Sequence, residues 1–153
     1  MRVLALDIGK VRTGIAISDP QGRVASPVCV LATEDVQAAA PAWKRVLEDW
    51  EPELLLAGLP RSLDGKDSAQ TKQARSIAEV LAAQTGLPIE FTDERLSSVQ
   101  AKRILHEEGL TEKDMRGKVD MIAASLFLQS WLDEQQAASE AEKPHETGTE
   151  GRS

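Results

Sequence analysis

The 153-residue sequence has one cysteine, two histidines, no tyrosine and no long apolar run. The lone cysteine, Cys29, excludes an intrachain disulfide and a metal site built from several cysteines. With only His106 and His145 present, no histidine-based zinc site is supported. No segment reaches membrane-spanning length, and the N-terminus lacks the basic and apolar regions of a signal peptide. We therefore expect a cytoplasmic protein without membrane contact.

The 18 basic residues are outnumbered by 25 acidic ones. The formal net charge of -7 argues against a uniformly basic nucleic-acid binder. Binding to nucleic acid needs only a local basic face, however, and metal ions held by a carboxylate site would neutralise part of the negative charge. Since Phe91 and Phe127 are the only phenylalanines, a base-stacking platform has little support. Any recognition of nucleic acid should rest on backbone contacts and shape.

The hydrophobic pattern predicts an α/β body. Three apolar segments separated by glycine-marked turns predict an antiparallel meander, after which helical and strand patterns alternate. Strands are predicted at 2–6, 14–18, 23–31, 54–58 and 89–92. Helices are predicted at 35–50, 66–84, 97–108 and 119–136, with the first starting as late as residue 40 because Pro41 suits a first turn. The polar composition beyond residue 136 predicts a domain at 1–136 and a disordered tail at 137–153.

Acidic residues recur where the predicted apolar elements begin or end. Asp7 follows the run 3–6, Asp93 and Glu94 follow the strand at 89–92, and Asp120 lies in the first turn of the last helix. Each acid has an ordinary explanation, such as a turn hydrogen bond, a surface ion pair or a favourable helix dipole. One sheet could nevertheless bring them together, and converging carboxylates suit hard cations such as Mg²⁺ and Mn²⁺.

Basic residues stand close in sequence to these acids and are candidates for binding phosphates. They are Lys10, Arg12, Arg61, Lys66, Arg95 and Lys118. The alternative is that they neutralise the carboxylates or are ordinary solvated charges, which is at least as good an interpretation for Lys66. The two glycines of 9–14 have the spacing of a phosphate loop, but Ile15 and Ala16 stand where a lysine and a Ser/Thr are required. This argues against a Walker-type NTPase.

Four segments together resemble the YqgF family, also called RuvX. They are residues 5–16, 58–60, 92–98 and 118–124, in the order and spacing of the family's motifs. The resemblance implies a ribonuclease-H-like domain related to the RuvC resolvases. It would have a five-stranded mixed sheet, with three antiparallel N-terminal strands plus parallel strands, flanked by helices.

The resemblance also implies metal-dependent cleavage at the 5′ end of precursor 16S ribosomal RNA. By position in the motifs, it assigns Asp7, Glu94 and Asp120 as catalytic residues and ligands of Mg²⁺ or Mn²⁺, with Asp93 as the uncertain neighbour. The segment 58–60 lacks the glutamate found in RuvC-type resolvases, so Glu94 would have to supply that charge from another strand. Lys10, Arg12, Arg61, Arg95 and Lys118 would contact the substrate backbone.

Three other interpretations stay open at this point. Holliday-junction resolution is the older proposal for the same fold, and its paired cuts would favour a homodimer over a monomer. A non-catalytic nucleic-acid-binding transcription factor would keep the basic residues but would never cut. A phosphotransferase of the actin and sugar-kinase type also opens with an Asp-x-Gly turn, but it needs two such lobes.

Overall fold

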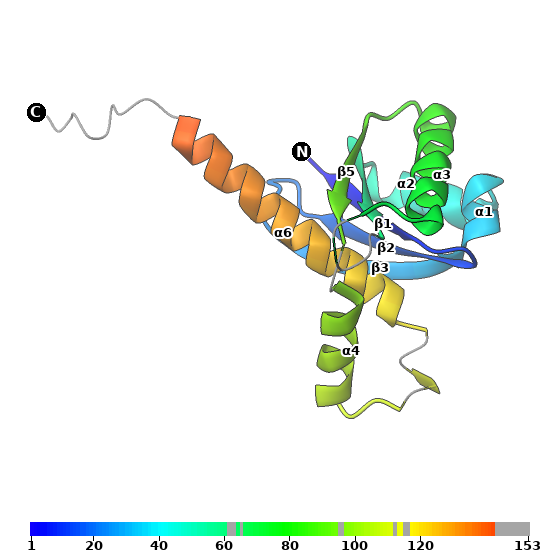
Figure 1. Cartoon of the computed structure of the whole chain (residues 1–153). Helices are drawn as coiled ribbons and strands as arrows, with labels where there is room; N and C mark the ends of the chain where they lie inside the picture. Colours follow the sequence, from blue (N-terminus) through cyan, green and yellow to red (C-terminus); the bar gives the residue numbers. More distant parts are fainter. Residues whose placement is uncertain (61–63, 65, 95–96, 112, 115–116, 143–153) are drawn as a thin grey trace, which may run out of the picture.

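A single five-stranded mixed sheet, in the order β3-β2-β1-β4-β5, forms the centre of the molecule (Figure 1). The structure, a computed structural model, describes residues 1–60, 64, 66–94, 97–111, 113–114 and 117–142. The strands are β1 (Val3–Ile8), β2 (Arg12–Ser18), β3 (Ala25–Ala32), β4 (Leu54–Leu59) and β5 (Ile89–Asp93). The first three pair antiparallel, whereas β4 is parallel to both β1 and β5. The predicted mixed sheet is confirmed.

Helices cover both faces of the sheet (Figure 1). Their bounds are α1 (Thr33–Gln37), α2 (Pro41–Trp50), α3 (Ala69–Thr85), α4 (Ser97–Glu107) and α6 (Val119–Glu142). One core cluster joins α1, α2 and α3 to one face, and a second joins α6 to the other. α4 packs on α6 rather than on the sheet. No helix in these parts of the chain is long and apolar enough to cross a membrane.

The alternation of side chains along β1 places Asp7 on the α6 face. Leu4, Leu6 and Ile8 belong to the cluster under α1, α2 and α3, while Val3 and Ala5 belong to the cluster under α6. Because successive residues of a strand point to opposite faces, Asp7 shares the face of Val3 and Ala5. The central strand is thus buried on both faces, and its one acid lies at the carboxyl end beneath α6.

Three predicted boundaries differ from the structure. The helix predicted at 35–50 is two helices, because Ala39 takes a left-handed φ of 55° and Pro41 begins α2 as its first residue. The first strand continues through Asp7, so this acid lies within β1 rather than after it. The last helix runs to Glu142, beyond the predicted start of the disordered tail at 137, because alanine and glutamate are strong helix formers.

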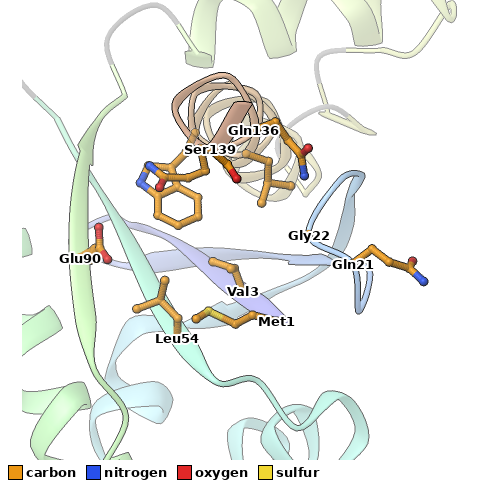
Figure 2. A pocket seen from close by; sticks show the side chains of 11 residues that line it. Met1, Val3, Gln21, Gly22, Leu54, Glu90, Gln136 and Ser139 are labelled. Atoms are coloured by element: carbon orange, nitrogen blue, oxygen red, sulfur yellow. The ribbon is translucent and has the colours of Figure 1, made fainter. Parts of the chain in front are cut away.

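A cavity of about 290 Å³ lies between α6 and the amino ends of β1 and β4 (Figure 2). Met1, Val3, Leu54 and Trp131 give it an apolar lining, with Glu90 at its side. Asp7 and Glu94 lie at the opposite, carboxyl ends of the parallel strands β1 and β5. The two ends of the sheet therefore have different chemistry.

Candidate active site

Asp7 lies in a row of the sheet between two glycines. It is paired with Gly14 of β2 on one side and with Gly58 of β4 on the other. Residues paired across neighbouring strands point to the same face, so neither neighbour adds a side chain beside the Asp7 carboxyl. The sheet surface around Asp7 therefore carries no other side chain in this row, beneath the first turns of α6.

The two glycines allow α6 and Glu94 to approach Asp7 closely. A Cβ atom on Gly14 would overlap the backbone carbonyl of Asp120. A Cβ atom on Gly58 would lie 2.6 Å from the Phe127 ring and 2.9 Å from Glu94 Oε2. Glycine at these two positions is therefore required by the packing, and this packing draws the three acids together.

The carboxyl groups of Asp7 and Glu94 form a buried, hydrogen-bonded pair. Asp7 is 7% exposed, and its burial is the largest effect on its pKa, which it raises. The hydrogen bond from Glu94 lowers this pKa and the negative charge of Asp120 raises it. The net result is a rise from 3.8 to about 6. Burial, the hydrogen bond to Asp7 and the charges of Asp7, Asp120 and Asp93 all raise the pKa of Glu94, to about 10. At neutral pH the pair therefore keeps one proton between its two carboxyl groups.

Asp120, the third acid, is paired with Arg12. The Arg12 Nε atom lies 3.1 Å from Asp120 Oδ2, and the two side chains are 53% and 24% exposed. With Asp120 turned to this arginine, no three His, Cys, Asp or Glu side chains in the described ranges form a ready-made ligand set. Asp120 nevertheless lies near enough to raise the pKa of both Asp7 and Glu94 by charge repulsion.

The turn between β1 and β2 presents Lys10 and Arg12 beside the acids. Two buried threonines hold it: the Thr33 hydroxyl donates to the Gly9 carbonyl oxygen at 2.8 Å and contacts the Thr13 hydroxyl, also at 2.8 Å. Lys10 borders two hollows, one with Asp7 and Glu94 and one with Arg12 and Asp120. The basic side chains thus flank the carboxylates on the open side of the site.

The site's own chemistry fits a divalent cation. Glu94 Oε2 is buried and has no hydrogen-bond partner, which is unusual because a buried polar atom without a partner costs free energy. Two carboxyls buried together also resist ionisation, and a nearby cation would remove that penalty. Carboxylate oxygens are the ligands that Mg²⁺ and Mn²⁺ prefer. An unused oxygen in a proton-sharing pair is therefore suited to a metal.

The predicted residues have different outcomes. Asp7, Glu94 and Asp120 are neighbours, and Glu94 rather than Asp93 is hydrogen-bonded to Asp7. Lys10 and Arg12 border the site, and Lys118 is exposed directly before α6. Arg61 and Arg95 lie outside the described residues.

Four residues of the site were not predicted from the sequence. Gly14 and Gly58 lie in its floor, and Gln70 and Gln73 line its side. A glycine inside an apolar strand signals close packing and could have pointed to the first two. The glutamines carry no such signal, because their place depends on how α3 meets the end of β4.

The fold and this cluster of acids define a class: an α/β protein of the ribonuclease-H-like resolvase fold. Its structure is similar to that of Thermus thermophilus RuvC in complex with a Holliday-junction substrate, with a TM-score of 0.53, 14% identity, and coverage of 90% of this chain and 96% of that one. It is also similar to the fowlpox virus resolvase bound to junction DNA, with a TM-score of 0.50, 14% identity, and coverage of 88% and 99%.

The sequence comparisons are more specific. A model of the RuvX family, described as Holliday junction resolvase, matches residues 1–134. A protein of Anaeromyxobacter sp. (strain Fw109-5), named "Putative pre-16S rRNA nuclease", is 41% identical over 133 residues, which cover 87% of this chain and 97% of the relative. A protein of Moorella thermoacetica with the same name is 37% identical over 133 residues, covering 87% and 95%. The chain belongs to the RuvX family.

Proposed function

We propose that this chain is a divalent-metal-dependent nuclease that cuts phosphodiester bonds of RNA at the 5′ end of precursor 16S ribosomal RNA. The observation that carries the proposal is the buried Asp7–Glu94 pair, with its unpartnered oxygen and with Asp120 beside it. A buried carboxyl pair of this kind destabilises the fold. Destabilising features of this sort cluster at functional sites. The names of the curated relatives support the choice of RNA substrate.

The acids and the basic residues have separate tasks in this proposal. Asp7, Glu94 and Asp120 would hold Mg²⁺ or Mn²⁺, which when bound would supply charge stabilisation at the reacting phosphate. Asp7 is mostly ionised at neutral pH, since its pKa is about 6, whereas Glu94 must lose its proton to serve as a ligand. Asp120 has to turn away from Arg12 to join them.

Arg12 and Lys10 would position the substrate. Arg12 is more than half exposed and its side chain is paired with Asp120, so a phosphate oxygen can replace that carboxylate. Lys10 is exposed between the two hollows and can neutralise a neighbouring phosphate. We assign Arg61, Arg95 and Lys118 to contacts with the substrate backbone. We place the activity in the cytoplasm, where precursor ribosomal RNA of bacterial relatives is found.

Holliday-junction resolution is the second candidate, and the description of the matching family favours it. Paired symmetric cuts in a four-way junction need two active sites, so this activity would require a homodimer. Maturation of one RNA end needs only one site, and a monomer is sufficient for it.

One assay separates the candidates. Wild-type protein is incubated with Mn²⁺ and a mixture of two differently labelled substrates, a precursor 16S 5′ RNA fragment and a four-way DNA junction. We expect cleavage of the RNA and an intact junction. Cleavage of the junction alone would support the second candidate. Binding of either substrate that persists in chelator, without cutting, would favour a non-catalytic nucleic-acid-binding protein and would contradict both.

A further inference from the structure

A small cavity opens beside the acid pair and has two walls of different chemistry. Its volume is about 150 Å³, and it lies between the carboxyl ends of β1 and β4 and the start of α3. Asp7, Glu94 and Lys10 form one wall, and Gln70 and Gln73 form the other. The proposed function uses the first wall and gives the glutamines no task.

The two glutamines present unused hydrogen-bonding groups to this cavity. They are three residues apart in the first turns of α3, so their side chains lie on one face of the helix. Both are exposed, and neither amide is hydrogen-bonded to another residue in the described ranges. Their amide groups are therefore available to a ligand.

The turn that carries the glutamines is firmly anchored. Ser68 and Thr71 cap α3 reciprocally: the Ser68 Oγ atom accepts from the Thr71 amide, and the Thr71 Oγ1 atom accepts from the Ser68 amide. The buried Thr71 hydroxyl also donates to the Pro60 carbonyl oxygen at 2.7 Å, which ties α3 to the segment after β4. The amides thus start from a fixed backbone position relative to Asp7, and such preorganisation favours selective binding.

The chemistry of the glutamine wall suits a neutral hydroxyl. A side-chain amide offers two donors and an acceptor oxygen, and a phosphodiester has no hydrogen to donate to that oxygen, whereas a hydroxyl has one. The 2′-hydroxyl of ribose is both a donor and an acceptor, and it is the group that lets a protein distinguish RNA from DNA. The cavity is also smaller than the roughly 300 to 1,000 Å³ of pockets that enclose a whole small ligand. It has room for part of a nucleotide, and the part nearest a reacting phosphodiester is the sugar.

We propose that Gln70 and Gln73 form a subsite that hydrogen-bonds the 2′-hydroxyl of the ribose next to the bond that is cut, and that this subsite gives the enzyme its preference for RNA. The inference rests on the proposed function, since it takes the acid pair as the place of cleavage.

The test compares two substrates that differ only in two 2′-oxygen atoms. The cleaved bond is first mapped in the precursor 16S 5′ fragment, and a second fragment is made with 2′-deoxyribose at the two nucleotides flanking it. We expect wild-type kcat/KM to be about tenfold higher for the all-ribose fragment, as the loss of one or two hydrogen bonds predicts. The double variant Q70A/Q73A should cut both at the same rate. The control variant Q135A replaces an exposed glutamine on the distal part of α6 and should keep the wild-type preference.

Several outcomes would overturn the inference. Equal cleavage of both fragments by wild type, or a preference retained by Q70A/Q73A, would remove the glutamines from sugar recognition. If the loss of rate in Q70A/Q73A depends on the identity of the flanking base and not on the sugar, the glutamines contact the edge of that base instead of the 2′-hydroxyl.

If wild type does not cut the all-ribose fragment, the proposed function fails, and binding then decides whether the glutamines recognise ribose. Fluorescence anisotropy in Mg²⁺ would compare the all-ribose fragment with its all-deoxy counterpart. A preference for ribose that Q70A/Q73A abolishes would support the subsite, and equal affinities of the wild type would exclude it.

Discussion

Replacing Asp7 with asparagine should stabilise the folded protein at neutral pH while it abolishes cleavage. Asp7 is 7% exposed, and burial raises its pKa from 3.8 to about 6. Well below pH 3.8 the carboxyl is protonated in both the folded and the unfolded chain, so it has no effect on stability there. Between about pH 4 and 6 the unfolded chain ionises first, and stability falls as the pH rises. Asparagine cannot ionise and removes this loss.

The size of the effect follows from the pKa. A rise of about two pH units, at about 1.4 kcal/mol per unit, corresponds to about 3 kcal/mol of stability lost above pH 6. The free energy of unfolding of D7N at pH 8 should therefore exceed that of wild type by up to about 3 kcal/mol, with little difference at pH 4. This is a large fraction of the roughly 5 to 15 kcal/mol that stabilises a typical domain.

Urea unfolding in chelator at pH 4, 6 and 8 measures this difference. D49N is the matched control, because Asp49 is exposed on α2; it should differ from wild type by less than about 0.5 kcal/mol at each pH. Added Mn²⁺ should stabilise wild type and not D7N, since a ligand stabilises the state that binds it. The reasoning is refuted if D7N is less stable than wild type at pH 8, or if its gain is the same at pH 4 as at pH 8.

Further predictions concern the packing and the proton of the site. G14A should lose about 1 to 3 kcal/mol of stability and most of its activity, because the added methyl group meets the Asp120 carbonyl. A urea unfolding midpoint equal to that of wild type would contradict the close approach of α6 to Gly14. T71V should lose about 1 to 2 kcal/mol, since it removes the Thr71 hydroxyl that accepts from the Ser68 amide and donates to the Pro60 carbonyl oxygen; a thermal melt identical to wild type would oppose this. Mn²⁺ binding at pH 7 should release about one proton, because Glu94 holds its proton to about pH 10. Calorimetry in two buffers of different ionisation enthalpy measures that release, and a heat independent of the buffer would rule it out.

The sheet and the positions of its acids could be predicted from the sequence because both depend on local patterns. Apolar runs and glycine-marked turns locate all five strands to within a few residues. An acid at the end of an apolar run, such as Asp7, stands out for the same reason, and the resemblance to a family ordered Glu94 and Asp120 around it. The fold class predicted in this way agrees with the resolvase structures.

The remaining features depend on which residues meet in three dimensions. The glycine row around Asp7 follows from the register of β1 with β2 and β4, which no local pattern fixes. The pairing of Arg12 with Asp120 joins residues 108 positions apart. The break between α1 and α2 arises because Ala39 adopts a conformation that alanine seldom takes, and the surrounding tertiary structure imposes it.

The most direct test of the account is the rate at which wild type and D7N cut the precursor 16S 5′ RNA fragment, each in Mn²⁺ and in chelator. We expect cutting by wild type in Mn²⁺ and none in the other three reactions, with D7N shown to be folded by its unfolding curve. Cutting by D7N at the wild-type rate, or by wild type in chelator, would contradict a metal-dependent site built on Asp7.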